Sequence, residues 1–176
     1  AEESKAEVQP GGKVTDSGRA LPKCPPDLLV SECFCCYNES EELKFIGGIM
    51  KDLYNIALNT IVPINLKKNG EAGHVACALE AASGTVFTGI CIDVPCSIGI
   101  CAEQAAVAEM LKTGETKIKR IIAVYEDGSV LPPCGRCREL ISQLDLDNEK
   151  TVIAIGHDRE VTLKELLPER WDRKWD

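Results

Sequence analysis

Hydrophobic residues are spaced differently in successive segments of the chain, and the spacing predicts which segments form helices and which form strands. From Ser40 onward, apolar side chains recur every three or four positions, which predicts a helix. Glu41 and Glu42 suit the N-terminus of that helix because its dipole favours negative charge. The recurring apolar positions are Leu43, Ile46, Ile49, Met50, Leu53, Ile56 and Ala57.

The remainder of the chain alternates between strand-like and helix-like segments. Apolar runs bounded by turn residues predict strands, and the last predicted helix is stopped near Pro168. Together these segments predict a mixed α/β layered fold without an internal repeat. The predicted strands cover residues 74–81, 85–92, 119–126 and 151–156, and the later helices cover residues 100–114, 134–144 and 163–171.

A length of 176 residues suits one well-buried domain and is too short for two ordinary ones. Residues 1–40 begin with a polar stretch rich in Gly, Pro and Ser, so we predict a flexible or loosely packed arm before a domain over residues 41–176. Two interpretations of the arm's cysteines stay open: a second metal site, or small apolar residues packed on the domain. The C-x-C-C spacing is unusual for zinc and favours the second. These cysteines are Cys24, Cys33, Cys35 and Cys36.

Charge and composition narrow the class of partner and the compartment. A net charge of −8 argues against nucleic acid as a partner. The sequence contains no apolar stretch long enough to span a membrane and no secretory signal pattern, so we expect no membrane partner and a cytoplasmic protein. In that compartment most of the ten cysteines are expected to be free thiols or metal ligands.

Cys134 and Cys137 form a C-x-x-C pair directly after two prolines, at the start of a predicted helix. Such a pair is compatible with a redox couple, half of a metal site or a disulfide. The redox interpretation gives no role to Cys101 and Glu103, which lie at the start of another predicted helix. If the two helix starts converge, three thiolates leave one position of a tetrahedral zinc ion open, and Glu103 can face that position without binding the metal.

The order C-A-E followed by P-C-x-x-C resembles the signature of zinc-dependent deaminases. The chain is similar to the cytidine deaminase family in its small, usually tetrameric form, over about residues 41–172. The resemblance also rests on VACALEAASGTVFTG, CAEQAAV, PPCGRCREL and LKELLP, which follow one another in the family's order. It implies a three-layer α/β/α fold with a mixed five-stranded sheet, a zinc cofactor, a small cytosine nucleoside as substrate and a homotetramer.

The resemblance also implies roles for individual residues. Cys101, Cys134 and Cys137 would hold zinc, and Glu103 would carry protons between the attacking water, the ring nitrogen and the leaving ammonia. Three thiolates outweigh the charge of the metal. Arg138 is either a donor to thiolate sulfur or a surface arginine. Gln104 stands where many members of the family have an arginine, and its amide can donate to sulfur only as a neutral group.

Substrate contacts are where the sequence departs from the family. The resemblance places Cys91, Asp93 and Ala102 at the substrate, but the family usually has Asn and Glu where Cys91 and Asp93 stand. Asp93 can accept a hydrogen bond from a sugar hydroxyl, whereas Cys91 is a poor substitute for Asn. His74 lies beside the position where the family often has an aromatic residue, and it is either a stacking residue or an ordinary strand-end histidine. Trp171 either closes a neighbouring subunit's pocket or anchors the C-terminus.

Several functions stay open on these residues. The leading prediction is hydrolytic deamination of cytidine or deoxycytidine to uridine or deoxyuridine, with release of ammonia. Blasticidin S or another modified cytosine nucleoside is close behind, because the deaminases of that antibiotic also lack the glutamate at the position of Asp93. From other classes come a non-catalytic zinc-containing binding protein with a deaminase fold, and a redox or metal-storage protein that uses its ten cysteines.

Overall fold

The computed structural model describes residues 50–172. The predicted arm, its four cysteines and the first part of the first predicted helix lie outside these residues, and so does the proposed domain boundary near residue 40. The second half of that helix is present as α1, Lys51–Thr60. None of the helices between residues 50 and 172 has the length and apolar content that a membrane crossing needs.

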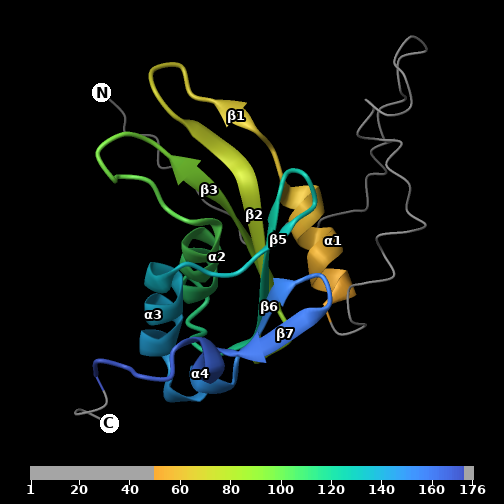
Figure 1. Ribbon diagram of the computed structural model, residues 1–176, viewed down its shortest axis with the longest axis vertical. Coiled ribbons are helices and arrows are strands. Elements are labelled where there is room, and N and C mark those ends of the chain that lie inside the picture. Colours follow the sequence, from red (N-terminus) through yellow and green to blue (C-terminus); the bar gives the residue numbers. More distant parts are fainter. Residues whose placement is uncertain (1–49, 173–176) are drawn as a thin grey trace, which may run out of the picture. The chain divides into compact units, whose positions relative to one another are not determined.

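A seven-stranded mixed sheet forms the centre of the fold (Figure 1). Five longer strands, β2, β3, β4, β6 and β7, lie in the order β3-β2-β4-β6-β7, because β3 and β4 pair with the same residues of β2 and therefore occupy its two edges. The pairing of β4 with β6 is parallel, and the other pairings among these strands are antiparallel. The longer strands are Glu71–Ala81 (β2), Val86–Asp93 (β3), Ile118–Tyr125 (β4), Val152–Gly156 (β6) and Arg159–Thr162 (β7).

Two further strands have two residues each. β1, Ile64–Asn65, pairs with the start of β2, and β5, Val130–Leu131, pairs with the end of β4. The five longer strands agree with the expected five-stranded mixed sheet, and β1 and β5 extend it. Sequence patterning did not predict β1, β5 or β7, because segments of two to four residues are too short for an alternating pattern to stand out.

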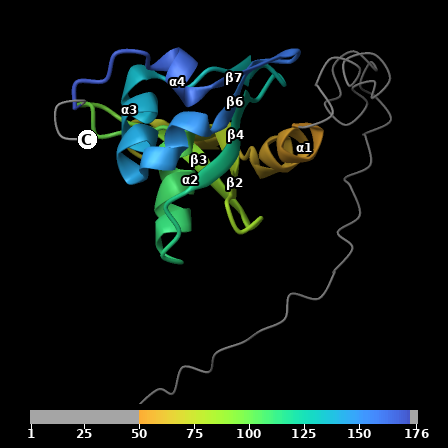
Figure 2. The same cartoon turned by 90° about the horizontal axis from the view of Figure 1, so that it is seen from below.

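Helices cover both faces of the sheet, so the predicted three-layer α/β/α arrangement is confirmed (Figure 2). α1 packs on one face, in a core that includes Ala78 and Ile122. On the other face, Cys77 and Leu79 contribute to the core under α2 and α3. Successive residues of β2 therefore serve opposite cores, as the alternation of a strand requires. The later helices are α2 (Ala102–Leu111), α3 (Gly135–Leu144), a 3-10 helix (Leu146–Lys150) and α4 (Leu163–Leu166).

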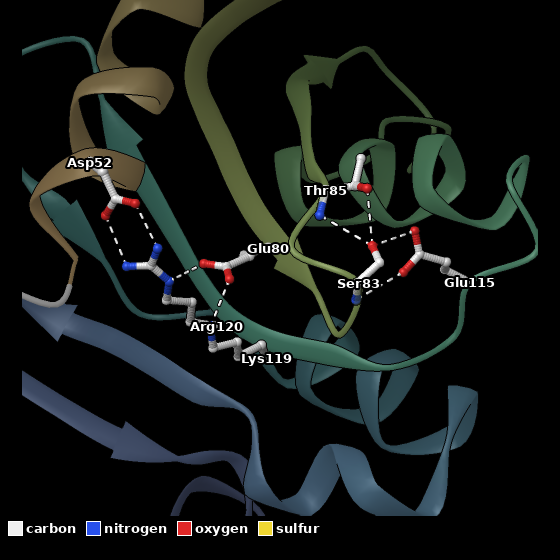
Figure 3. A network of polar contacts seen from close by, with 7 residues as sticks. All are labelled: Asp52, Glu80, Ser83, Thr85, Glu115, Lys119 and Arg120. Carbon is white, nitrogen blue, oxygen red and sulfur yellow. Dashed lines mark hydrogen bonds and ion pairs between the residues drawn. The ribbon is translucent and has the colours of Figure 1, made fainter.

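An ion-pair network connects α1 to the sheet (Figure 3). The guanidinium of Arg120 in β4 donates to both carboxylate oxygens of Asp52 in α1, at 2.8 and 2.6 Å. Arg120 also donates to Glu80 in β2, and Lys119 donates to the same carboxylate at 2.8 Å. The buried carboxylate of Glu80 therefore has two cationic partners. A separate polar group lies at the β2–β3 turn, where the hydroxyl of Ser83 donates to Glu115 at 2.9 Å.

The connection from β3 to α2 is compact and determines where α2 begins. Ile92 and Ile100 form two backbone hydrogen bonds of 2.9 Å with each other, which closes the loop between them. Within that loop Cys96 and Ser97 have φ angles of 65° and 58°, a left-handed conformation that is uncommon for residues other than glycine. At Gly89 a side chain would come within 2.5 Å of the carbonyl oxygen of Ala102, so glycine permits close packing of β3 on α2.

Candidate metal centre and catalytic carboxylate

Three cysteines from two helix N-termini meet at one point. Cys101 is the N-cap residue of α2, Cys134 is the N-cap residue of α3, and Cys137 lies in the first turn of α3. The Sγ atoms of Cys101 and Cys134 are 3.7 Å apart, and those of Cys134 and Cys137 are 3.5 Å apart. All three sulfur atoms lie within 4.8 Å of one another. The predicted convergence of the two helix starts is therefore present.

The sulfur cluster fits a zinc ion. Zinc bonds to thiolate sulfur at about 2.3 Å, and tetrahedral geometry then separates two ligand sulfurs by about 3.8 Å. The distances of 3.5 and 3.7 Å between the sulfurs agree with that spacing. Among residues 50–172, these cysteines are the one group of His, Cys, Asp and Glu side chains close enough to share a metal ion. Three sulfur ligands leave the fourth position open, as a catalytic zinc site requires.

The three thiols are not equivalent. Burial raises the pKa of Cys101 and of Cys137, and the negative charge of Glu103 adds to the effect in both cases. Burial also acts on Cys134, but the pKa of Cys134 is lowered overall because the backbone N–H and thiol of Cys137, the thiol of Cys101 and the backbone N–H of Arg136 hydrogen-bond its sulfur. Cys134 is therefore the sulfur that the other groups of the cluster solvate best.

Glu103 lies in the first turn of α2, next to the sulfur cluster, with only 7% of its surface exposed. Burial raises the pKa of its carboxyl, and a hydrogen bond from Cys137 partly opposes this effect. A small apolar cavity lies against Glu103, lined by residues of β4, β5 and β6 and their neighbours: Ile121, Ile122, Ala123, Leu131, Pro133, Ile153 and Ala154. An apolar wall favours the neutral carboxyl group, so Glu103 is suited to accept and donate protons.

Cys77 is a residue beside the site that the motif did not reveal. It lies in β2, is fully buried, and belongs to the core under α2 and α3. Burial raises the pKa of its thiol strongly, and the charge of Glu103 contributes. The alternation of β2 assigns Cys77 to the same face as Leu79, but nothing in the sequence places it beside Glu103.

The predicted substrate residues lie around the end of β3 and the start of α2. Cys91 is partly buried, and its sulfur accepts a hydrogen bond of 3.3 Å from the backbone N–H of Val75. That N–H lies where the pairing of β2 with β3 shifts register, between Ala72 and Ala76. Asp93 is exposed at the last position of β3. Ala102, the first residue of α2, is fully buried in the core, its backbone included.

Arg138 and Gln104, which the sequence offered as candidate donors to the metal sulfurs, make backbone contacts. The Nε atom of Arg138 donates to the carbonyl of Pro133 at 2.8 Å, and Nη1 donates to the carbonyl of Leu166 at 3.4 Å. Arg138 thus binds backbone carbonyls and is partly exposed. The described contacts contain no hydrogen bond between the side chain of Gln104 and a sulfur atom; its backbone N–H donates to the carbonyl of Cys101 at 3.1 Å.

Two aromatic candidates also have polar partners. The Nδ1 atom of His74 lies 2.8 Å from a carboxylate oxygen of Glu126. The indole N–H of Trp171 donates to Glu139 in α3, while the residue remains 62% exposed.

Three thiols around an open ligand position, with a buried carboxyl group beside them, define a metal-dependent hydrolytic site.

Comparisons with known proteins agree with this description. The family model of the cytidine and deoxycytidylate deaminase zinc-binding region matches residues 55–161. A cytidine deaminase of Mycobacterium tuberculosis (strain CDC 1551 / Oshkosh) is 34% identical over 97 residues, which cover 54% of this chain and 70% of that protein. Blasticidin-S deaminase of Bacillus cereus is 29% identical over 109 residues, which cover 57% and 78%. The crystal structure of cytidine deaminase from Mycobacterium tuberculosis has a TM-score of 0.57 at 27% identity, covering 68% of this chain and 94% of that chain.

The chain belongs to the cytidine and deoxycytidylate deaminase family, since the family model spans more than half of its 176 residues. It is therefore an enzyme of the deaminase class with a zinc-binding site, and the prediction of a zinc cofactor is confirmed by the family and by the cysteine cluster. Membership in the family argues against the non-catalytic binding protein and the redox or storage protein that the sequence left open.

Proposed function

We propose that this chain hydrolyses the exocyclic amine of a free cytosine nucleoside and releases ammonia. Cytidine and deoxycytidine are the leading substrates, with uridine and deoxyuridine as products. The observation that carries the proposal is the position of Glu103: a buried carboxyl with a raised pKa lies beside three sulfurs whose spacing fits zinc. The relatives described as cytidine deaminases support the same reaction.

The residues of the chain divide the reaction between them. Cys101, Cys134 and Cys137 would hold the zinc ion, which when bound supplies Lewis-acid activation of water. Glu103 accepts the proton of the water that adds to the amine-bearing carbon and gives it to the ring nitrogen. It then moves the second proton of that water to the amino group, which leaves as ammonia. The apolar wall beside Glu103 offers its carboxyl no polar side chain as a competing partner.

For substrate recognition we propose Cys91, Asp93 and Ala102. Asp93 is exposed and can accept hydrogen bonds from sugar hydroxyls. The sulfur of Cys91 already accepts from Val75, so Cys91 adds shape to the wall of the pocket rather than a polar contact. The sugar is then held by fewer polar groups than an Asn and Glu pair would provide, and we expect ribose and deoxyribose to be accepted alike.

Blasticidin S is the second candidate substrate. The blasticidin-S deaminase of Bacillus cereus matches over a larger share of its length than the cytidine deaminase of Mycobacterium tuberculosis does, 78% against 70%, although at lower identity. A recognition strand with one carboxylate also suits a cytosine compound whose sugar differs from ribose. Other modified cytosine nucleosides fall into the same group.

The setting of the enzyme follows from the same resemblance. We propose a homotetramer in the cytoplasm that acts on a small molecule and binds neither nucleic acid nor a membrane. The net charge of −8 supports the exclusion of nucleic acid. Trp171, exposed and oriented by Glu139, is the candidate contact with a neighbouring subunit.

The test is an ultraviolet assay of deamination with the zinc-loaded full chain, run in parallel on cytidine, deoxycytidine and blasticidin S. The variant Glu103→Gln is the control for each substrate. Turnover of cytidine that is lost in the variant supports the leading proposal. Turnover of blasticidin S alone moves the assignment to the second candidate. A zinc-loaded protein that releases ammonia from none of the three contradicts both.

A further inference from the structure

Arg138 holds the segment that carries Cys134 from two sides. Its backbone N–H donates to the carbonyl of Cys134 at 3.0 Å, as the first helical hydrogen bond of α3. Its Nε atom donates to the carbonyl of the preceding residue, Pro133, at 2.8 Å. One residue therefore binds the carbonyls on both sides of the Cα atom of Cys134, and the orientation of the two peptide groups sets the direction of the Cys134 side chain.

The carbonyl of Pro133 needs this partner. Pro133 is buried and lies between β5 and α3, where no strand pairing is available to its carbonyl. A buried carbonyl without a partner costs free energy, so the segment would turn if the guanidinium were absent. Because Cys134 is the sulfur that lies 3.7 and 3.5 Å from the other two, such a turn would move the centre of the cluster.

The other end of the guanidinium reaches the C-terminal helix. Nη1 of Arg138 donates to the carbonyl of Leu166, the last residue of α4, at 3.4 Å. The start of α4 is fixed by a capping box between Thr162 and Glu165. Its first residue, Leu163, is 1% exposed in the core. α4 is thus a fixed support, and Arg138 connects that support to the metal loop.

We propose that Arg138 is a positioning residue that couples α4 to the metal centre, by holding the Pro133–Cys134 peptide bond against the end of α4. It acts on geometry through two carbonyls and not by donating to sulfur. The inference rests on the proposed function only in taking Cys134 as a zinc ligand. It predicts that the C-terminal helix, which contributes no metal ligand, influences how firmly zinc is held.

The test measures zinc release from the full-length holoprotein to a chromogenic chelator, together with the spectrum of the Co²⁺-substituted protein. Arg138→Met keeps the length of the side chain and removes its donors. We expect zinc release about tenfold faster, because groups that orient metal ligands typically contribute factors of about 10 to 100 to affinity. The thiolate-to-metal bands of the Co²⁺ protein should shift. Among zinc-loaded molecules kcat should fall while KM for cytidine stays unchanged.

Two further variants separate the clamp from charge and from general stability. Arg138→Lys keeps the charge but replaces the planar fork with a single donor point, so it should release zinc almost as fast as Arg138→Met. A lysine variant with the wild-type release rate would show that charge alone suffices and would overturn the clamp. Arg159→Met, at an exposed arginine in β7, is the matched control and should behave as wild type.

A double-mutant cycle tests the coupling to α4. Thr162→Ala removes the cap of α4 without touching the metal loop, and should speed zinc release by a smaller factor than Arg138→Met. In the double variant the increases in zinc-release rate should not multiply. Once the guanidinium of Arg138 is gone, nothing connects α4 to the metal loop, so loss of the α4 cap has no further effect on zinc. Factors that multiply would overturn the coupling, as would an Arg138→Met protein that holds zinc like wild type. A wild type that holds no zinc would instead contradict the proposed function.

Discussion

Glu80 and Glu103 expose nearly the same fraction of their surface to solvent, on opposite faces of one sheet, and the pKa values of their carboxyl groups shift in opposite directions. Glu80 is 6% exposed and Glu103 is 7% exposed. Hydrogen bonds from Lys119 and Arg120 lower the pKa of Glu80 in spite of burial. Burial raises the pKa of Glu103, whose polar neighbours are thiols. Burial alone therefore does not decide the protonation of a glutamate; the partners that its surroundings supply decide it.

The difference assigns each face its role. On the α1 face, cations hold the Glu80 carboxyl permanently ionised, so it can join the helix to the sheet but has no proton to exchange near neutral pH. On the α2 and α3 face, Glu103 has no side-chain cation among its described contacts, and its side-chain partner is the thiol of Cys137, one of the three cysteines that would hold zinc. A buried carboxyl whose pKa is raised by its surroundings is suited to proton transfer.

Among the variants that test the different roles of Glu103 and Glu80, Glu103→Gln is expected to have the largest effect. The change should lower kcat for cytidine by about 10² to 10⁴, the usual contribution of general acid–base catalysis. Zinc content and thermal stability should stay close to wild type, because the amide has the same shape and does not bury a charge. Steady-state kinetics on zinc-quantified protein, together with a melting curve, measure both.

The matched control for this prediction is Glu80→Gln, which makes the same chemical change at a residue with a similar exposed fraction. It should lower stability and leave kcat per folded molecule unchanged. If Glu80→Gln lowers kcat as much as Glu103→Gln does, the two faces are not functionally distinct, and the assignment of Glu103 as the proton carrier is wrong.

Removal of the metal is the second test. It should lower thermal stability through the α2 and α3 face, where the three cysteines lie, and leave the ion pairs of the α1 face intact. Zinc bound at about a thousand times its dissociation constant stabilises the native state by about 4 kcal/mol, so chelation should lower the melting temperature by roughly 10 °C. The decrease should be of similar size in Glu80→Gln, because the ion-pair network lies on the α1 face. A melting temperature that changes neither when a chelator removes zinc nor when zinc is added back would contradict a metal centre at Cys101, Cys134 and Cys137.

Glu80→Gln gives the next smaller effect, on stability. In the variant, the hydrogen bonds from Lys119 and Arg120 no longer have a charged acceptor. A hydrogen bond to a charged group contributes about 1.5 to 3 kcal/mol, so the free energy of unfolding should fall by about that amount. Denaturant unfolding of the full chain measures it. Glu115→Gln is the control, because Glu115 is a partly exposed acceptor from Ser83 and should cost no more than about 0.5 kcal/mol.

The sequence predicted most of the metal site because the chemistry there is local. Cys134 and Cys137 lie within one helical turn, and Cys101 and Glu103 lie within another, so each pair is fixed by its own helix start. Only the convergence of the two starts needs tertiary structure, and the order of the motif implied it. The layered fold was equally predictable, because its long strands and helices carry clear periodicity.

Contacts that depend on backbone position were not predictable. Arg138 binds the carbonyls of Pro133 and Leu166, and only the fold determines that these carbonyls lie within its reach. Cys91 accepts from Val75 because the register of β2 shifts there, and no residue pattern announces that shift. Cys77 lies beside Glu103 because β2 passes under α2, which depends on how the layers pack.

The smallest predicted effect concerns Asp52 and the pH dependence of the α1 face. The hydrogen bond from Arg120 lowers the pKa of Asp52 in the folded protein, so its contribution to stability is present above its unfolded pKa of about 3.9 and is lost as pH falls through the folded value. Asp52→Asn should therefore cost less than about 1 kcal/mol at pH 7, since Asp52 is largely exposed, and should cost nothing once both forms are neutral. Denaturant midpoints of the two proteins at pH 7, 5, 4 and 3 measure the difference. A difference in stability between the two proteins that stays constant down to pH 3 would mean that the Asp52 side chain acts through its shape or its hydrogen bonds to the helix. It would also mean that Arg120 holds Glu80 without help from α1.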